Sequence, residues 1–521
     1  MQSLQWQEVN DPAQLRYATF MVDHGMAPYR DLIEMNMPGI YLTNLAVVHT
    51  LGDGNLAWRL FDLLLMALAA AAMISIAWPY DWFAGVFSAA LFILFHGHDG
   101  AMQTGQRDLI LAVMMLCAYA FLFHAVRTRA ALPMVGFGLA AGIAMTFKPT
   151  PFPFTILLIV LTAIHLHKKN QQSTNRAWLL PTALALLGLL VPLAVVIGFL
   201  LSKHAVASFV TVLRISLPYY ATLGRRSYGG LLLEISPSVW WFTLLIVPIV
   251  LWGPTTKFWN SHLRVPGAEA EFADENRNGY PYKDPWESRI IVMGVLFGIA
   301  SYLAQGKGLP YHRYPMVAFL FLWGSLQLGS AIRSQGAVRK LGLVGLAYGL
   351  VLAPLYVREA DHNKWSTTYI NNLTEDLRQL GGNDLNGKVQ CLATEAECAT
   401  TLYRMQLTQA TGLFYDYFIF GPENQQAIQL WRARFVQELN QNQPEVFVVH
   451  TGLYPHRDGY EKLVSWPLFA NYLKDNYVPY ADRRFPTTHS VDMAYRIYIR
   501  RDLEQKIASE KAPQWVANPG I

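Results

Sequence analysis

A series of apolar stretches, each close to the length that crosses a lipid bilayer, occupies the first two-thirds of the chain. Charged residues make up only 15% of the sequence, where a soluble domain carries about 25%, and they gather in the last third. About ten apolar stretches occur, and several cover only about 16 residues. They begin near Ala57, Trp82, Leu109, Leu132, Phe152, Trp178, Val239, Ile290, Tyr314 and Leu341. The sequence therefore excludes an ordinary soluble globule and predicts a mainly α-helical, polytopic transmembrane bundle followed by a water-soluble domain.

Basic residues fall on every second connection between these stretches, and this alternation predicts an orientation. They are Arg127 and Arg129, then Lys168, Lys169 and Arg176, then Lys257, Arg264, Arg277 and Lys283, and finally Arg333, Arg339 and Lys340. Connections rich in Lys and Arg stay on the cytoplasmic side of a membrane. We therefore expect the other connections and both ends of the chain on the outer, periplasmic side of a bacterial inner membrane.

Three domains follow from this topology. Residues 1–56 are expected to form a periplasmic acidic loop with amphipathic juxtamembrane helices, residues 57–357 the transmembrane domain of about ten spans, and residues 358–521 a periplasmic domain. The chain would then begin outside the membrane, although residues 1–10 cannot span it. Either this segment is translocated unaided or a first helix precedes Met1, and we favour the second interpretation.

The tail has the alternating pattern of an α/β domain, and we expect a mixed sheet with helices. Residues 424–439 carry apolar side chains at helical spacing. Runs typical of strands cover residues 388–392, 414–420, 446–450 and 495–499.

Three cysteines exclude a disulfide scaffold. Cys391 and Cys398 lie close together in the tail, and on an oxidising outer face a small-loop disulfide is the favoured interpretation. Cys117 lies inside an apolar stretch, where it is expected to be a packing residue.

Four carboxylates cluster in the first outer segment, ahead of an amphipathic stretch at Ile40–Leu51; they are Asp11, Asp23, Asp31 and Glu34. Such a cluster beside a membrane surface is a candidate for acid–base chemistry. The alternatives are that Asp11 caps a helix with Pro12 at its first position, and that Asp23 and Asp31 are solvated loop residues.

The second outer loop holds Arg107 and Asp108 at the start of the next apolar stretch. A carboxylate at a helix N-terminus is favoured electrostatically, so capping is the alternative to a catalytic role. His96, His98 and Asp99 have the composition of a metal site, but their spacing on a loop is a weak signal for one.

Cations and phenols gather in the later outer connections. Lys148 directly follows an apolar stretch, and Lys307 lies between two glycines, so an anion-binding turn is a candidate there. The alternative for both lysines is that they snorkel to lipid headgroups. Further candidates in these connections are Arg214, Tyr219, Tyr220, Arg225, Arg226, Tyr311, His312 and Arg313.

The order of these motifs over residues 1 to about 357 resembles that of the polytopic GT-C glycosyltransferases, the superfamily of protein O-mannosyltransferases and lipid A aminoarabinose transferases. Members take sugars from polyprenyl phosphates and usually have a helix before the acidic loop. The sequence departs from the family at Met35–Gly39, where Lys-Pro-Pro is usual. The residues that match are Asp11 and Pro12, then Gly25, Tyr29, Asp31, Glu34 and Pro38, then Arg107 and Asp108, and Thr146 to Lys148.

The resemblance implies an inverting transfer of a sugar from a polyprenyl-phosphate donor to a periplasmic glycan, lipid or protein. A phosphate is a good leaving group, so one general base and a cationic clamp suffice, whereas a glycosidase needs two carboxylates. Asp11 is the expected base, Asp108 an orienting or metal-assisting carboxylate, and Glu34 a further catalytic candidate. The expected donor-binding residues are Arg107, Lys148, Arg225, Arg226, Lys307, Tyr311 and His312.

No metal ligand and no certain cofactor follow from the sequence, and a divalent cation is left open. The expected partners are the donor, the acceptor and the bilayer. The net charge of +5 is spread over short loops, so nucleic acid is not expected.

Two other classes remain as alternatives. The first is a transporter or flippase of lipid-linked sugars, although transport sites usually lie near the bilayer midplane and the charges here lie on one face. The second is an inactive scaffold that presents the tail to periplasmic partners.

Overall fold

The computed structural model describes residues 2–169, 178–252, 285–362, 367–393, 397–455, 459–485 and 493–511. The chain folds into two compact units. The first, here called the membrane unit, consists of Met1–Trp6, Met37–Gly198 and Arg225–Lys364. The second, here called the sheet unit, consists of Gln7–Asn36, Phe199–Gly224 and Trp365–Ile521. The first outer segment therefore divides between the two units, which the sequence did not lead us to expect.

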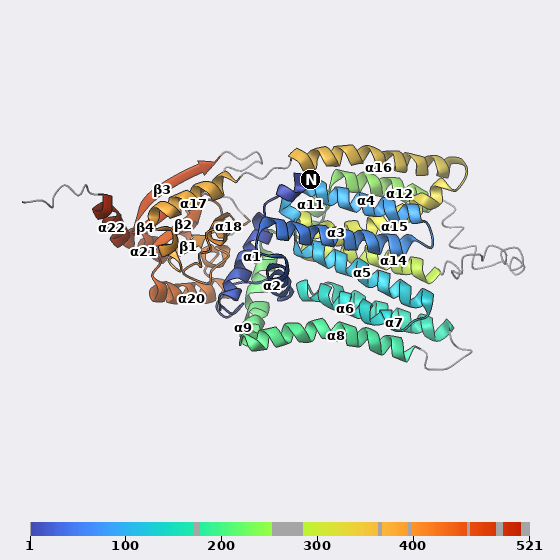
Figure 1. The fold of residues 1–521 in the computed structure, drawn as a ribbon, viewed down its shortest axis with the longest axis horizontal. Helices are drawn as coiled ribbons and strands as arrows, with labels where there is room; N and C mark the ends of the chain where they lie inside the picture. Colours follow the sequence, from blue (N-terminus) through green and yellow to red (C-terminus); the bar gives the residue numbers. More distant parts are fainter. Residues whose placement is uncertain are drawn as a thin grey trace, which may run out of the picture. The chain divides into compact units, whose positions relative to one another are not determined.

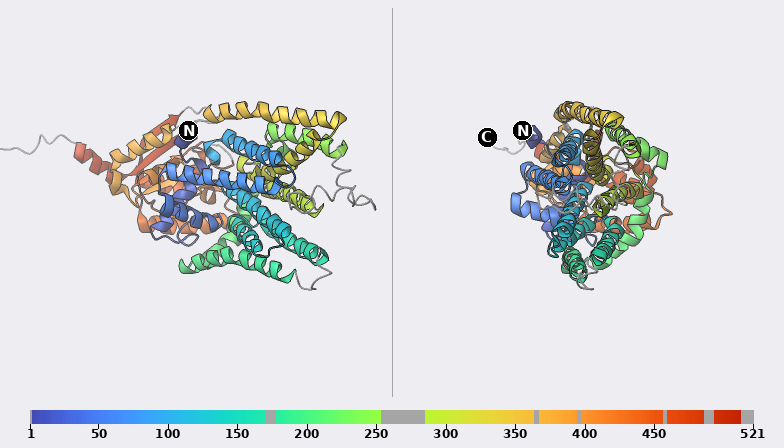
Figure 2. Two further views of the ribbon diagram at one scale, coloured as in Figure 1. Left: turned by 45° about the vertical axis from the view of Figure 1, so that its right-hand side comes forward. Right: turned by 90° about the vertical axis from the view of Figure 1, so that its right-hand side faces the viewer.

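Each of the ten predicted apolar stretches forms a helix, and Figures 1 and 2 show the helices of the membrane unit running alongside one another. They are α3 (Asn55–Ala77), α4 (Trp82–Asp99), α5 (Arg107–Thr128), α6 (Pro133–Phe147), α7 (Pro151–Lys169), α8 (Leu179–Ser202), α12 (Pro237–Trp252), α14 (Pro285–Gln305), α15 (Tyr314–Ile332) and α16 (Gly336–His362).

Seven of the described helices are long and apolar enough to cross a membrane, by length and composition: α3, α5, α7, α8, α14, α15 and α16. The apolar parts of α6 and α12 are shorter, and α4 ends in the polar segment His96–Asp99. The chain is thus a multi-pass membrane protein. Several basic residues that predict its orientation, Arg176 and those between 253 and 284, lie outside the described residues.

Helices α5 and α15 form the centre of the membrane unit. In their most apolar segments, 72% of the α5 residues and 78% of the α15 residues are buried. Helix α15 packs against α4, α5, α12, α14 and α16, and α5 packs against α3 and α6. Short elements cover the ends of these helices: α2 (Gly39–Leu51), which is the predicted amphipathic stretch, η2 (Ala101–Gln103), α11 (Tyr228–Leu233) and η5 (Pro310–Arg313).

The sheet unit is built on a four-stranded mixed sheet in the order β1-β2-β4-β3, drawn from orange to red in Figure 1. Strands β1 (Val389–Leu392) and β2 (Val446–His450) are parallel and buried along their whole length. Strand β4 (Met493–Arg500) runs antiparallel to β2 and to β3 (Tyr477–Phe485). The helices of this unit are α1 (Asn10–Asp23), α9 (Val206–Thr211), η3 (Val212–Ser216), α10 (Leu217–Thr222), α17 (Thr368–Leu380), α18 (Glu397–Arg404), α19 (Tyr417–Phe420), α20 (Gln426–Asn442), α21 (Pro467–Asn476) and α22 (Arg501–Lys511).

The predicted α/β class of the tail is confirmed, with one strand wrong and one missed. Residues 414–420 end in the short helix α19, because their aromatic side chains pack in a cluster in which Tyr415 and Tyr417 stack. Strand β3 escaped prediction because it is a polar edge strand with an irregularity between Pro479 and Ala481. Proline is tolerated at such an edge.

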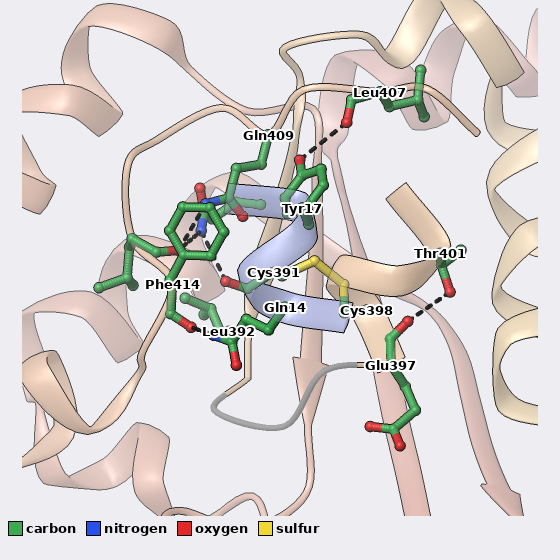
Figure 3. The surroundings of a disulfide bond; sticks show 12 residues. Gln14, Tyr17, Cys391, Leu392, Glu397, Cys398, Thr401, Leu407, Gln409 and Phe414 are labelled. Carbon is green, nitrogen blue, oxygen red and sulfur yellow. Dashed lines mark hydrogen bonds between the residues drawn. A yellow bond between two sulfur atoms is a disulfide. The ribbon is translucent and has the colours of Figure 1, made fainter. Parts of the chain in front are cut away.

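The predicted disulfide between Cys391 and Cys398 is present, with 6.1 Å between the two Cα atoms. It joins the buried strand β1 to helix α18. Figure 3 shows the bond beside Gln14 and Tyr17 of α1, and α1 packs against α18. The disulfide therefore braces the neighbours of α1. Cys117 on α5 is a free, partly buried thiol.

Candidate active site

Asp108 and Lys148 form an ion pair where α5 begins and α6 ends. Asp108 is in the first turn of α5 and is fully buried. The Lys148 ammonium lies 2.6 and 2.8 Å from the two carboxylate oxygens. A buried carboxylate in an apolar bundle needs such a partner. The lysine is thus directed into the protein, and the snorkelling interpretation of Lys148 is wrong.

Gln305, the last residue of α14, completes this pair. Its amide nitrogen donates to Asp108 at 3.1 Å, and its amide oxygen accepts a hydrogen bond from Lys148. Sequence reasoning missed this residue because an uncharged amide at the end of an apolar stretch carries little signal. Its position two residues before Lys307 was the one available clue.

Element η5 brings an aromatic pair to the same place. His312 is 4% exposed, and its imidazole lies within electrostatic range of Lys148, Arg107 and Lys307. The ring of Tyr311 packs edge-on against that of His312 at 4.7 Å, and the Lys148 ammonium is 6.0 Å from the Tyr311 ring. Five residues predicted as donor contacts are therefore close to one another.

Gly306 and Gly308 lie on either side of Lys307, with φ angles of +66° and +68°. A positive φ favours glycine, so these two residues shape the loop. Lys307 itself is buried, at 5% exposure, which does not fit a snorkelling lysine. Two exposed arginines flank this loop: the Arg225 side chain lies against Gly306, and the Arg226 amide donates to the Gly306 carbonyl at 2.8 Å. The Arg226 guanidinium pairs with Glu234.

These side chains are here called the cation cluster: Arg107, Asp108, Lys148, Gln305, Lys307, Tyr311 and His312. Lys148 pairs with Asp108, and Lys148, Arg107 and Lys307 all lie within electrostatic range of the buried His312 imidazole, so the cluster brings three cations together. Among the described residues, Nδ1 of His312 is a buried nitrogen without a hydrogen-bond partner. Such groups usually mark a place where a polar ligand or water binds. The cluster has the chemistry of an anion-binding site.

Asp11 and Glu34 belong to the sheet unit. Helix α1 is capped by Val9, and Asp11 is the second residue of the helix, so the interpretation of Asp11 as the cap is wrong by two positions. A carboxylate in the first turn still gains from the helix dipole. Asp11 is partly exposed, so a reactant can reach it.

Glu34 has a different environment. It is 1% exposed, and its carboxylate accepts from the backbone amides of Met35 and Asn36 at 2.7 and 2.9 Å. The Tyr415 hydroxyl donates to its other oxygen at 3.2 Å. These bonds hold the turn after Glu34 to the sheet unit.

The Tyr417 hydroxyl lies within electrostatic range of the Asp11 and Glu34 carboxylates. Burial raises the pKa of Tyr417 well above its ordinary value, and the neighbouring Tyr220, Tyr415, Glu34 and Asp11 add to this effect. The phenol therefore stays protonated at every physiological pH and remains a hydrogen-bond donor.

His96, His98 and Asp99, which were predicted to lie on a loop, lie in the last turn of α4. His96 contacts Asp62 and Tyr314 through its two ring nitrogens at 3.0 and 2.8 Å, and Asp99 pairs with Arg313 at 2.8 Å. In the described part of the chain, no group of three His, Cys, Asp or Glu side chains could hold a metal ion.

Sequence reasoning also missed Asp62, a fully buried carboxylate inside the span α3. An ionisable residue within an apolar stretch was itself the signal.

The ten apolar helices and the C-terminal sheet give the chain the GT-C fold that its motifs predicted. The similar solved structures include ArnT from Cupriavidus metallidurans. Bound to undecaprenyl phosphate, ArnT aligns at 13% identity over 95% of both chains with a TM-score of 0.51. In the apo state it aligns at 13% identity over 96% of both chains with a TM-score of 0.54. No family model and no curated protein sequence matches the chain.

Proposed function

We propose that the protein is a membrane glycosyltransferase that moves a sugar from a polyprenyl-phosphate donor to an acceptor on the periplasmic side of a bacterial inner membrane. The cation cluster carries the proposal: it brings three cations within electrostatic range of one buried imidazole, at the ends of apolar helices. A lipid phosphate combines an anionic head with an apolar chain, and it matches both features. The shared fold with ArnT, whose structure was solved with undecaprenyl phosphate, supports the same ligand class.

In the proposed reaction, Arg107, Lys148 and Lys307 hold the donor phosphate. Charge-assisted hydrogen bonds from Arg and Lys are strong, and they stabilise the negative charge that the phosphate keeps as its bond to the sugar breaks. Asp108 and Gln305 fix the Lys148 ammonium, so that the cation is already oriented when the donor arrives. No proton needs to be given to the leaving group, because a phosphate departs as an anion.

We propose Asp11 as the general base that takes the proton of the acceptor hydroxyl while this oxygen attacks the anomeric carbon. Inversion at that carbon follows from a single displacement. Glu34 was a further catalytic candidate in the sequence, but its oxygens accept hydrogen bonds from Met35, Asn36 and Tyr415. Glu34 is also only 1% exposed, so an acceptor hydroxyl has little access to it, and we assign Glu34 to holding the turn.

Donor binding by the Lys307→Met variant tests the proposal. The measurement is a titration of the purified protein in detergent with a short-chain polyprenyl-phosphate sugar at two salt concentrations. Loss of a hydrogen bond to a charged group should weaken binding by about 1.5–3 kcal/mol. Lys340→Met, an exposed lysine of α16, is the matched control and should bind like the wild type. Equal dissociation constants for wild type and Lys307→Met would remove Lys307 from the site.

The fate of the sugar separates a transferase from a transporter. A transferase should release free polyprenyl phosphate and a glycosylated acceptor from the donor, whereas a flippase should leave the donor intact on the other side of a vesicle. Transport of intact donor without product would contradict the proposal.

A further inference from the structure

A second buried polar network lies in the membrane unit, and none of the steps proposed above uses it. Its centre is Asp62 on α3, which is fully buried. Asp62 pairs with Arg59 one turn earlier and with Nε2 of His96 at 3.0 Å. Its other oxygen accepts a hydrogen bond from the backbone amide of Gly105 at 3.2 Å. One carboxylate thus binds a helix, a neighbouring helix and a loop.

The network continues through His96 to a second loop. Nδ1 of His96 lies 2.8 Å from the hydroxyl of Tyr314. When Nε2 donates its proton to Asp62, Nδ1 is the acceptor and the Tyr314 hydroxyl the donor. Tyr314 is the first residue of α15 and directly follows η5, which carries Tyr311 and His312.

The two loops that meet this network lead to Arg107 and Asp108 on one side and carry Lys307, Tyr311 and His312 on the other. Gly105 lies two residues before Arg107 and three before Asp108. Gly105 has a φ of +67°, and a Cβ atom there would lie 2.7 Å from the Trp58 indole. Trp58 and Asp62 are one helical turn apart on α3, so together they form the surface against which this loop packs.

Stability alone does not require such a network. A buried ion pair in an apolar bundle is often no more stable than apolar side chains of the same size, and ionisable residues inside membranes are costly. Hydrogen bonds fix the distance between donor and acceptor to within a few tenths of an ångström. They therefore position groups more precisely than apolar packing does. The network links the loop before α5 and the loop before α15 through one carboxylate.

We propose that Asp62 is a positioning residue that sets the geometry of the phosphate site, through Gly105 on one side and through His96 and Tyr314 on the other. The inference rests on the proposed function, since it assigns Asp62 to the same donor-binding site. Asp62 does not touch the donor. It fixes where Arg107, Asp108 and His312 lie.

The test compares donor affinity and thermal stability in Asp62→Ala, Asp62→Asn and Glu287→Ala. Glu287 is the matched control, because it is a buried carboxylate of the same unit, bonded to Tyr80 and Arg127 at the opposite end of α5. The probe is a short-chain polyprenyl phosphate without sugar, titrated in detergent. Loss of one hydrogen bond to a charged group weakens binding about ten- to hundredfold, so Asp62→Ala should bind at least about tenfold more weakly.

The other variants separate positioning from stability. Asp62→Asn keeps an acceptor for Gly105 and a partner for His96, so it should recover most of the wild-type affinity. Glu287→Ala should unfold at a lower temperature with an unchanged dissociation constant. The inference is overturned if Asp62→Ala binds like the wild type, if Asp62→Asn is as weak as Asp62→Ala, or if Glu287→Ala loses as much affinity.

Two further variants keep the test decisive if Asp62→Ala does not fold or if the proposed function itself is wrong. If Asp62→Ala does not fold, Tyr314→Phe removes only the hydroxyl that binds His96; it should weaken binding severalfold, and wild-type affinity there overturns the inference. Lys307→Met tests the proposed function itself. If Lys307→Met loses affinity and Asp62→Ala does not, only the positioning role fails. If the wild type binds no polyprenyl phosphate, the proposed function fails and the inference fails with it.

Discussion

At the scale of single residues, the membrane unit pairs its buried carboxylates with cations. Asp108 pairs with Lys148, Asp62 with Arg59, and Glu287 with Arg127. Removing one partner of such a pair leaves an uncompensated charge and costs about 3–5 kcal/mol. Variants of the paired residues therefore mix folding with function. Each substitution in such a pair needs a measurement of stability beside the measurement of function.

Asp11→Asn should lower the transfer rate by at least about a hundredfold, within the usual contribution of a general base. The amide keeps the shape of the carboxylate but cannot accept the proton. Donor affinity should stay at the wild-type value. Steady-state turnover and a donor titration measure the two effects.

Asp23→Asn is the control for Asp11→Asn, because Asp23 is an exposed carboxylate at the other end of α1. It should turn over like the wild type. Near-normal turnover of a folded Asp11→Asn protein would place the base elsewhere, with Asp31 and Glu34 as the next residues to substitute.

Gly105→Ala should weaken donor binding, because the added methyl group meets the Trp58 indole and shifts the loop before Arg107. Gly52→Ala is its control. Gly52 has a φ of +101° with nothing within 4 Å of an added Cβ, so this variant carries backbone strain, about 1 kcal/mol, without a clash. Gly52→Ala should lower the thermal midpoint and leave donor affinity unchanged. Equal affinities for the two variants would mean that the loop tolerates the methyl group.

At the scale of elements, α1 depends on its neighbours in the sheet unit for its position. The Gln14 amide donates to the Phe414 carbonyl and the Tyr17 hydroxyl to the Leu407 carbonyl, both at 3.0 Å. The disulfide lies beside the same two side chains of α1 (Figure 3). The helix that presents Asp11 is thus fixed by side-chain contacts to segments almost 400 positions away in the sequence.

Replacing both Cys391 and Cys398 with Ser should destabilise the sheet unit by about 2–3 kcal/mol, the chain-entropy value for a loop of this size. Turnover should fall as α1 loosens, while donor affinity should not change, because the cation cluster belongs to the membrane unit. Denaturant unfolding followed by circular dichroism, with parallel donor titrations, measures both. Cys117→Ser is the control for the loss of a thiol. A drop in donor affinity of the double variant would contradict this assignment.

The sequence predicted elements well where one physical signal dominates. Bilayer length and apolarity located the ten helices, and runs rich in β-branched, aromatic and other apolar residues located β1, β2 and β4. Strand β3 was missed because its exposed positions are polar and Pro479 interrupts it. Helix α19 was mistaken for a strand because an aromatic run favours both a strand and a tightly packed turn.

The candidate site was predictable only in part, because a local sequence signal marks some of its residues and not others. Lys148, Lys307 and Arg107 stand out as charges at the ends of apolar stretches. Gln305 and Gly105 do not, since their roles depend on which helix ends meet, and that is a property of tertiary packing. The partnership of Asp62 with Gly105 joins residues 43 positions apart, and no local pattern indicates it.

At the scale of the whole molecule, the alternating basic connections predict that Ser3 and Asn371 both lie on the outer side. Cysteines introduced at these positions in a Cys117→Ser background should both react with an impermeant thiol reagent in intact spheroplasts, and a cysteine at Lys340 should react only after lysis. Asn371 is exposed on α17 and Lys340 on α16. Labelling of only one of the two outer positions would refute the topology.

Helices α5 and α14 are tied to each other at both ends. Asp108 in the first turn of α5 binds Gln305, the last residue of α14, and Arg127 in the last turn of α5 binds Glu287 in the first turn of α14. With 22 residues, α5 is about 33 Å long, which matches the hydrocarbon thickness of a bilayer. Neither helix can slide past the other without breaking a bond at each end. In a thinner bilayer the two must tilt as one body, and the thickness of the surrounding lipid therefore sets the depth of the proposed phosphate site relative to the headgroups.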